Sequence, residues 1–363
     1  MKIKILKQEF LKNIQHVQNI ISSKNSLPIL SNILIEAEKN KVVLTSTDLN
    51  IGMSSSLETD VEEEGAITIP AKRFNDIIKE LPDEDISIST MKNNSMVIKC
   101  SKCFFKIIGL PKEEFPKLPE FKDEPNVIIK QSVLKNMINM THFSMSHDDT
   151  RYVLNGALFL FKGKQLTIVT TDGKRLSFVK KDIEKDGLNK VVIIPSKTIY
   201  ELNRILGDEG DVKIVFSENQ VKFDLKNITI ISRLIEGDFP NHEQVVPKEA
   251  QEKIMIQRSQ FLDGIKRAAL LTTQDSQSVK FEILKNKIVV SKSSPNIGEV
   301  REEIDTVYKG QEITVGFNPN YILDVLKIIP QDEIALEVFG PDKPAVIRIE
   351  DWFLYLALPM QLV

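Results

Sequence analysis

Apolar and polar residues recur along this chain with two different spacings. In residues 8–21 the apolar side chains return every third or fourth position, which predicts an amphipathic helix with Lys12 and His16 on its polar face. Residues 41–47 and 86–91 are instead short β-branched or alternating runs, which predict strands. Both patterns continue to the end of the chain, so we expect a few helices separated by groups of short strands.

One strand–helix unit occurs three times. Residues 191–206 comprise a β-branched run, a proline and then an amphipathic helix, and residues 67–78 and 313–326 have the same form. An interval of 124 residues separates Asp48 from Asp172, which follow corresponding strands. A period this long indicates whole folded modules rather than short solenoid repeats.

Segments rich in proline and charge, around residues 116–125 and 247–253, separate the repeats. We therefore predict three modules, with the boundaries 1–122, 123–248 and 249–363. Each module is expected to contain two amphipathic helices and about eight strands, an α+β architecture with helices against antiparallel sheets. Strands at the end of one module can pair with the next module, and a closed ring of modules would leave no exposed edge.

Some elements can be placed more closely. Further helices are expected over residues 131–143 and 259–271, the second with Ser259 as its N-cap. Strands are expected over residues 29–36 and 152–161.

The composition is that of a globular protein with nearly balanced charge. The 363 residues are 42% hydrophobic and 27% charged, with a net charge of −3. This balance argues against a nucleic-acid binder held by bulk positive charge, although positive charge on one surface remains compatible with it. No apolar run approaches the roughly 20 residues that span a bilayer, and the N-terminus lacks the apolar core of a signal peptide. We therefore expect a cytoplasmic protein.

The sequence contains no Walker loop, no Gly-x-Ser-x-Gly nucleophile and no His-Glu-x-x-His metal motif. The run His147-Asp148-Asp149 could hold a metal, although it also suits a solvated loop before a strand. Cys100 and Cys103 form a lone Cys-x-x-Cys pair without the two further ligands of a structural zinc, and their flanks look like two strands around a tight turn. We interpret them as reduced thiols and expect no metal, no cofactor and no catalytic residue.

Five short motifs, taken in order across the three repeats, resemble those of a known family. They read Leu27-Pro28-Ile29-Leu30-Ser31-Asn32, Arg151-Tyr152-Val153-Leu154-Asn155-Gly156, Thr171-Asp172-Gly173-Lys174-Arg175-Leu176, Gly316-Phe317-Asn318 with Tyr321, and Leu358-Pro359-Met360. Over its whole length the chain resembles the bacterial DNA polymerase III beta subunit family, the sliding clamps. The resemblance implies a non-catalytic head-to-tail homodimer closed into a six-module ring, with twelve inner helices facing duplex DNA and the sheets outside.

The same resemblance implies sequence-independent contacts between the inner helices and duplex DNA. Cations on the polar faces of the helices would give weak, salt-screened contacts that permit sliding. The candidates are Lys12, Lys72, Arg73, Lys79, Lys197, Arg204, Lys266, Arg267 and Lys327, together with Lys24 and Tyr152 on loops.

A peptide groove between modules 2 and 3 is implied as well. Its expected partners are the replicative polymerase catalytic subunit, the clamp-loader complex, and other polymerases, mismatch-repair and ligase-type proteins that carry short linear motifs. Apolar walls would take Leu or Phe anchors, and methionine would adapt its shape to them. The expected lining is Leu154, Thr171, Gly173, Arg175, Leu176, Pro240, Val245, Asn318, Tyr321, Val346, Leu358, Pro359, Met360 and Leu362.

At the C-terminus we expect residues 353–357 to form a core strand and residues 358–362 to belong to the groove. The chain departs from the usual pattern of the family at Lys174, Pro344, Gln361 and the terminal Val363. These departures bear on which peptides the groove prefers.

The resemblance further implies that Leu270 and Leu271 of one subunit meet Phe105 and Ile107 of its partner. Two alternatives to a DNA clamp remain at this point. One is a metal-dependent phosphoryl-transfer enzyme of repeated α+β fold, with its site at residues 147–149. The other is a protein-only scaffold that never meets DNA.

Overall fold

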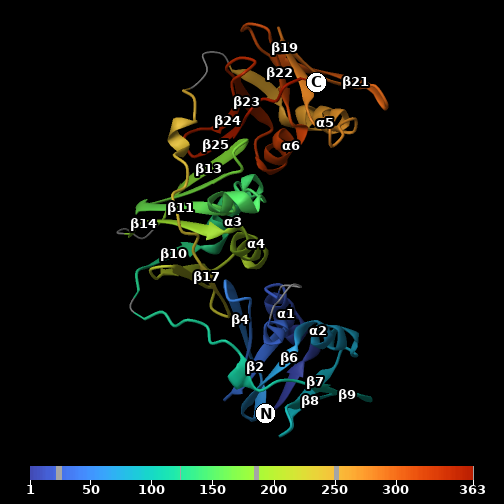
Figure 1. The fold of residues 1–363 in the computed structure, drawn as a ribbon, viewed down its shortest axis with the longest axis vertical. Helices are drawn as coiled ribbons and strands as arrows, with labels where there is room; N and C mark the ends of the chain where they lie inside the picture. The colour runs from blue at the N-terminus through green and yellow to red at the C-terminus, as the bar shows by residue number, and fades with distance from the viewer. Residues whose placement is uncertain (22–26, 123, 184–187, 249–252, 363) are drawn as a thin grey trace. The chain divides into compact units, whose positions relative to one another are not determined.

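The computed structural model describes residues 1–21, 27–122, 124–183, 188–248 and 253–362. Two compact units make up the chain (Figure 1). Unit 1 comprises residues 1–135 and 200–234, and unit 2 comprises residues 136–199 and 235–363. Each unit combines helices with antiparallel sheets, as the sequence predicts.

Unit 1 contains two antiparallel sheets. The strands of the larger sheet are, in spatial order, β10 (Asn126–Lys130), β15 (Asp211–Phe216), β16 (Gln220–Asp224), β17 (Ile228–Arg233), β4 (Ile51–Glu58), β3 (Lys41–Thr47), β2 (Asn32–Glu38) and β6 (Gly65–Pro70). Those of the smaller sheet are β5 (Asp60–Glu63), β1 (Lys2–Leu6), β7 (Asp85–Thr90), β8 (Ser95–Cys100) and β9 (Cys103–Ile108).

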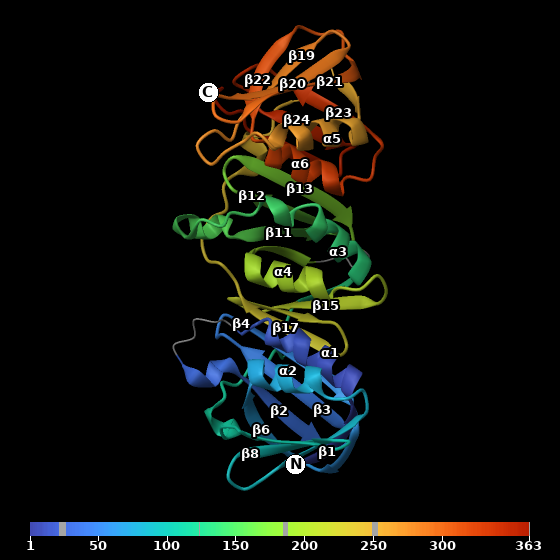
Figure 2. The ribbon, with the colours of Figure 1, turned by 90° about the vertical axis from the view of Figure 1, so that its right-hand side faces the viewer.

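Two helices cover one face of the unit 1 sheets. Figure 2 shows α1 (Lys7–Gln18) and α2 (Ala71–Glu80) side by side. Phe10 of α1 and Phe74 of α2 are both fully buried and meet edge to face, with ring centroids 5.6 Å apart. This contact lies on the apolar faces of the two helices, so their polar faces are left to solvent.

Unit 2 is built on a single large antiparallel sheet. Its strands are, in spatial order, β14 (Leu188–Pro195), β11 (Gly156–Gly163), β12 (Gln165–Thr171), β13 (Arg175–Asp182), β25 (Phe353–Ala357), β24 (Ala345–Ile349), β23 (Glu333–Val338), β18 (Ile254–Gln257), β21 (Gly298–Val307), β20 (Lys287–Ser294), β19 (Val279–Leu284) and β22 (Ile313–Phe317). Helices α5 (Arg258–Ala269) and α6 (Pro319–Ile328) belong to this unit. Helices α3 (Gln131–Asn139) and α4 (Ser196–Ile205) contribute residues to both units.

Strands from successive repeats pair directly. In unit 1, β4 of the first repeat pairs with β17 of the second, for example Gly52 with Ile231. In unit 2, β13 of the second repeat pairs with β25 of the third, for example Leu176 with Leu356. The prediction that strands at the ends of neighbouring repeats pair is confirmed at both places, which we call the unit 1 seam and the unit 2 seam.

Several predicted element boundaries were wrong. Residues 29–36 begin as a 3₁₀ turn, Pro28–Ser31, because Pro28 starts a helical turn more readily than a strand. Residues 152–161 likewise begin in a 3₁₀ segment, Asp149–Leu154, and the strand starts only at Gly156. Asp148 caps this segment by accepting the N–H of Thr150, so the acidic run initiates a turn.

The helices also differ in detail from their predicted ends. Ser259 is not an N-cap, because α5 starts directly from the preceding strand with Gln257 at the cap position and no side-chain capping bond. Helix α3 ends at Asn139, and His142–Ser144 form a separate 3₁₀ turn. Helix α1 ends at Gln18, and the strand β1 before it was not anticipated.

Candidate functional site

A tight turn between β12 and β13 organises the candidate site. Asp172 Oδ1 accepts hydrogen bonds from the backbone N–H groups of Lys174, at 2.9 Å, and Arg175, at 3.0 Å. The Thr171 hydroxyl donates to the Arg175 carbonyl at 2.6 Å and accepts the N–H of Gly173 at 3.0 Å. Gly173 has a φ of +83°, in the left-handed region that favours glycine. Residues 171–175 therefore form a tight turn held by the side chains of Thr171 and Asp172.

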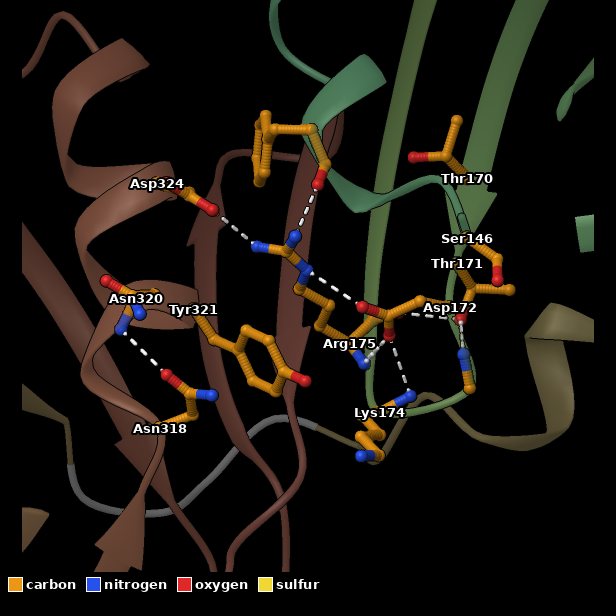
Figure 3. Close-up of polar contacts among 12 residues, drawn as sticks. Ser146, Thr170, Thr171, Asp172, Lys174, Arg175, Asn318, Asn320, Tyr321 and Asp324 are labelled. Carbon is orange, nitrogen blue, oxygen red and sulfur yellow. Dashed lines mark hydrogen bonds and ion pairs between the residues drawn. The ribbon is translucent and has the colours of Figure 1, made fainter. Parts of the chain in front are cut away.

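The side chain of Arg175 ties this turn to α6 (Figure 3). Its guanidinium donates to Asp172 Oδ2 at 3.1 Å, to Asp324 Oδ2 at 2.6 Å and to the Phe143 carbonyl at 2.5 Å. It also lies 4.7 Å from the ring centroid of Tyr321. Burial lowers the pKa of Arg175, but the hydrogen bonds and charges around it raise this pKa above its ordinary value. The guanidinium is thus charged, and its hydrogen bonds hold it to the turn and to α6.

An apolar pocket of about 150 Å³ lies beside the turn. Leu176 and Leu356 form its buried floor, while Leu358 and Val245 stand at its rim with exposed side chains. The complete lining is Leu154, Thr171, Gly173, Lys174, Arg175, Leu176, Pro240, Asn241, His242, Val245, Leu356 and Leu358. A pocket of this volume is too small for a typical cofactor and suits one or two apolar side chains of a peptide.

Eight of the fourteen predicted groove residues line this pocket: Leu154, Thr171, Gly173, Arg175, Leu176, Pro240, Val245 and Leu358. Val346 is fully buried beneath it, in the same apolar cluster as Leu176. Asn318 caps α6 by accepting the N–H of Asn320 at 3.0 Å, and Tyr321 packs on Arg175 (Figure 3). These three residues therefore support the pocket without lining it.

The end of the chain runs away from the pocket. After Pro359, the N–H of Met360 donates to the Gly316 carbonyl at 2.8 Å. Leu362 packs on Gly316 and lines a separate hollow that includes Ser278 and Lys280. The three remaining predicted residues, Pro359, Met360 and Leu362, therefore do not line the pocket. The prediction of a core strand at residues 353–357 is confirmed, because every residue of β25 is buried.

Sequence reasoning missed Asn241, His242 and Leu356 as lining residues. His242 lies beside Phe178 of β13, with ring centroids 6.0 Å apart, and burial lowers its pKa. The pairing of β13 with β25 places Leu356 directly opposite Leu176. The strand pattern of residues 353–357 signalled Leu356 as a core residue, but its place in the pocket depends on this pairing.

Ten of the eleven predicted DNA-facing residues lie in the described part of the chain, and Lys24 lies outside it. In unit 1, Lys12, Lys72, Arg73 and Lys79 are exposed on α1 and α2. Among the described residues, no carboxylate lies within ion-pair distance of these four. Arg204 is the remaining described DNA-facing candidate of unit 1, and it donates to Glu201 at 2.8 Å and to the His16 carbonyl at 2.9 Å.

The predicted cations of unit 2 are largely paired. Lys266 lies 3.3 Å from Asp263, Arg267 lies 2.7 Å from Glu302, and Lys327 lies 3.7 Å from Asp324. Of the two others in this unit, Lys197 is half-buried and Tyr152 is exposed. The cations of unit 2 are therefore partly neutralised, whereas α1 and α2 carry unpaired positive charge.

The residues predicted at the dimer contact differ in exposure. On β9, at the edge of its sheet, Phe105 is 39% exposed, but Ile107 is only 7% exposed and packs within unit 1. Phe104 and Ile108 on the opposite face of β9 are more exposed, at 60% and 77%. The sequence of this short run does not indicate this difference, because exposure depends on which face of the strand packs inward.

In unit 2, the helix end that carries the predicted leucine pair points partly to solvent. Leu270 is 78% exposed, whereas Leu271 is half-buried. An exposed leucine of this kind is characteristic of a contact surface when others lie nearby.

No metal centre is visible in the described residues. Within those residues, no group of three His, Cys, Asp or Glu side chains is placed to hold a metal ion. Asp148 instead accepts hydrogen bonds from Thr150, which lower the pKa of its carboxyl. Cys100 and Cys103 face each other across the β8–β9 hairpin as free thiols. None of the described helices is long and apolar enough to cross a membrane.

Comparison with known proteins identifies the family. The N-terminal, central and C-terminal domain families of the DNA polymerase III beta subunit match residues 1–119, 128–241 and 243–361. The beta sliding clamp of Staphylococcus epidermidis is 34% identical over 362 residues, which cover 97% of this chain and 96% of the relative. The crystal structure of the DNA polymerase sliding clamp from Bacillus subtilis matches with a TM-score of 0.95 and 31% identity, and covers all of both chains.

A further solved relative is the sliding clamp of Bartonella birtlesii bound to griselimycin. It matches with a TM-score of 0.95 and 30% identity, again over all of both chains. Repeated α+β modules with paired seams thus define the fold of a DNA clamp. The chain belongs to the bacterial DNA polymerase III beta subunit family, the sliding clamps, which are non-catalytic processivity factors of DNA replication. Neither the phosphoryl-transfer enzyme nor the protein-only scaffold is supported by these matches.

Proposed function

We propose that two copies of this chain join head to tail into a six-module ring that encircles duplex DNA and tethers the replicative polymerase. The observation that carries this proposal is a pair of unpaired strand edges. β9 ends the smaller sheet of unit 1, and residues 298–305 of β21 pair with β20 on one side only, since β18 reaches only Thr306 and Val307. Within the described residues, no strand pairs with either edge. Joining β9 of one copy to β21 of the next would remove both edges.

The chemistry of the two edges suits this pairing. β9 carries exposed Phe104, Ile108 and Lys106, whereas β21 carries exposed Glu299, Glu303 and Asp305. Apolar and basic side chains would therefore meet an acidic strand, with Leu270 and Leu271 beside the joint and Phe105 and Ile107 in the facing module. Leu271→Ala should weaken the dimer, as analytical ultracentrifugation at low concentration would measure. An unchanged mass in that experiment would count against this interface.

The inner surface of the proposed ring needs only to avoid repelling DNA. Unpaired Lys12, Lys72, Arg73 and Lys79 on α1 and α2 support weak phosphate contacts. Lys24, Tyr152, Lys197, Arg204, Lys266, Arg267 and Lys327 are proposed as further contacts of the same kind. Such contacts carry no sequence preference and are screened by salt, so they permit sliding.

Retention on circular DNA tests the topological proposal. The protein, assembled on nicked circular duplex by a clamp-loader complex, should remain bound through gel filtration and should be lost when the circle is linearised. A non-topological binder would be retained equally on both forms. Release from the intact circle at the same rate as from the linear form would sink the proposal.

The pocket of unit 2 is proposed as the docking groove for short linear motifs. The proposed partners are the polymerase catalytic subunit, the clamp loader, and further polymerases, mismatch-repair and ligase-type proteins. A buried leucine floor beside an engaged arginine supports recognition of Leu or Phe anchors. Lys174 at the rim should favour an acidic residue near the anchor.

Deletion of residues 358–363 should leave the fold and the dimer intact but abolish binding of a Leu- and Phe-bearing polymerase tail peptide, because the deletion removes the rim at Leu358. Fluorescence anisotropy would measure the affinity and circular dichroism the fold. Unchanged affinity would overturn the groove assignment.

The remaining predictions complete the proposal. We place the module boundaries at residues 122 and 248, each inside a proline- and charge-rich segment, and the protein in the cytoplasm, where replication proceeds. No cofactor or metal takes part in this function.

A further inference from the structure

The two seams present corresponding rows of side chains on the face away from the helices. In unit 2, Leu176 pairs with Leu356, and Leu356 pairs with Val346, so three apolar residues lie in one row across β13, β25 and β24. In unit 1, the corresponding row across β4, β17 and β16 is Gly52, Ile231 and Lys222. The flanking strand confirms the match, because Thr171 pairs with Leu176 and Thr47 pairs with Gly52.

Unit 1 therefore lacks the two outer apolar residues of the row. Gly52 stands where unit 2 has Leu176, and Lys222 stands where unit 2 has Val346. Bare glycine and a lysine in these places would leave the apolar Ile231 between them open to water. Ile231 is nevertheless only 7% exposed, so another part of the chain covers this row.

The linker between β9 and β10 runs along unit 1 (Figure 1, blue-green trace). It brings two apolar side chains to this row. A Cβ added to Gly52 would lie only 2.4 Å from Leu118 Cδ2, so the side chain of Leu118 occupies the space above Gly52. Three residues further on, the ring of Phe121 lies over Lys222, with the Nζ atom 5.6 Å from the ring centroid. Leu118 and Phe121 thus each cover one of the two substituted positions.

The contact rests on side chains alone. Residues 116–122 contain no helix or strand, and among the described residues none of them makes a backbone hydrogen bond to the neighbouring strands. Both anchors are half-buried rather than deeply enclosed, and Glu120 between them is exposed. A segment held in this way can leave the sheet without disturbing the strand pairing beneath it.

We propose that residues 116–122, which we call the strap, are the chain's own ligand at the unit 1 seam, where they close a second peptide groove. Leu118 and Phe121 present the same anchor chemistry that the unit 2 groove is proposed to bind. The inference rests on that proposed groove, whose row of residues it takes as the reference. It explains why, among the described residues, the unit 1 seam is covered while the unit 2 seam forms a pocket.

Peptide binding by the full-length protein tests the strap. The probe is a fluorescent synthetic peptide of residues 114–122, Glu-Phe-Pro-Lys-Leu-Pro-Glu-Phe-Lys. All proteins carry the deletion of residues 358–363, which removes binding at the unit 2 groove. The test variant is Leu118→Ala with Phe121→Ala, and the matched control is Glu120→Ala, which changes the strap between its anchors.

The double variant should bind one probe per protomer in isothermal titration, at least tenfold tighter than the protein with the native strap. Glu120→Ala should bind no better than the native strap. A folded double variant with no gain in binding would overturn the strap alone. Equal, saturable binding by the protein with the native strap would also overturn the strap, because a seated strap should exclude the probe. The unit 2 groove assignment is tested separately by the loss of polymerase tail peptide binding on deletion of residues 358–363.

A second variant keeps the test valid if the double variant does not fold. Gly52→Leu places a side chain where Leu118 now lies, so it should push the strap off the sheet. Trypsin should then cut after Lys117 at least fivefold faster than in the wild type, while Glu120→Ala should cut at the wild-type rate. An unchanged cleavage rate in Gly52→Leu would contradict the seated position of Leu118.

Discussion

The seams of units 1 and 2 begin with the same turn and end with different surfaces. Asp48 Oδ1 accepts the N–H groups of Asn50 and Ile51 at 2.9 and 2.8 Å, as Asp172 does for Lys174 and Arg175. The threonine before each aspartate donates to the carbonyl four residues on, at 3.0 Å in unit 1 and 2.6 Å in unit 2.

The surfaces differ in the residues that follow this shared turn. Unit 1 continues with Ile51 and Gly52, where unit 2 has Arg175 and Leu176. The turn sets the direction and register of the strand, and the next two side chains decide whether the seam is closed or forms a pocket. The same turn therefore supports the same strand pairing in both units, while a few outward side chains set whether a seam can bind a ligand.

The largest effect should follow from giving unit 2 the residue of unit 1. Leu176→Gly removes the buried pocket floor and should cost about 4 kcal/mol of unfolding free energy, and peptide binding should fall below detection. Urea unfolding and fluorescence anisotropy would measure the two effects. Leu158→Ala is the matched control, because Leu158 belongs to the same buried cluster but does not line the pocket. Equal loss of binding in the control would show that stability, not the floor, limits binding.

The second-largest effect should follow from Arg175→Ile, which gives unit 2 the residue that unit 1 has at position 51. It removes the bonds to Asp172, Asp324 and Phe143 and takes the guanidinium away from two half-buried carboxylates, so the unfolding free energy should fall by about 2–3 kcal/mol from that of the wild type. Arg151→Ala, which loses only an exposed 3.4 Å contact with the Asp172 carbonyl, should change stability by less than about 0.5 kcal/mol. A neutral Arg175→Ile would mean that the link to α6 contributes nothing to folding.

Acid should weaken unit 1 through His16. Burial, followed by the charges of Arg204 and Lys12, lowers the pKa of His16 from 6.5 to about 4. The unfolded chain therefore takes up this proton first, so the contribution of His16 is complete above pH 6.5 and is lost as the pH falls toward 4. One repeat later stands Met140, which does not titrate. His16→Met should reduce the loss of urea stability between pH 7 and pH 5, and an unchanged loss would exclude His16 as the cause.

The smallest effects concern the left-handed residue in each turn. Gly173→Ala should lower the free energy of unfolding by about 1 kcal/mol, because Gly173 has a φ of +83° and the new Cβ would lie 2.7 Å from Arg151 Nη1. Leu49 holds the same position in unit 1 with φ +75°. Leu49→Gly should relieve backbone strain, so the free energy of unfolding should fall by no more than about 0.5 kcal/mol. Thermal unfolding of both variants tests this, and a large loss in Leu49→Gly would contradict equivalent turns.

The repeat interval predicted much of this comparison, because it is a property of the sequence. It aligned Asp48 with Asp172 after corresponding strands, and the repeated modules predicted the paired seams. It could not place Asn241 and His242 in the pocket, because the path of a linker across a sheet depends on tertiary packing. That the residues lining the unit 2 pocket bind a peptide stays a prediction.

Strand faces limit what the sequence can predict about β9. Phe105 and Ile107 stay a prediction for the dimer contact, and Phe104 and Ile108 are the more exposed side chains of β9. A shift of one residue along a strand exchanges its two faces, and nothing local to this short apolar run fixes which face packs inward. Leu362 differs for another reason, since its backbone neighbour Met360 bonds to Gly316 and directs the chain away from the pocket.

The central claim is that two copies of this chain close into a ring. Electron-microscopic class averages of the purified protein, with no DNA present, test it most directly. We predict a closed ring of six similar lobes around a central hole, because the unpaired edges of β9 and β21 would then pair with each other. Compact single particles without a hole would contradict the ring, and the topological tether would fall with it.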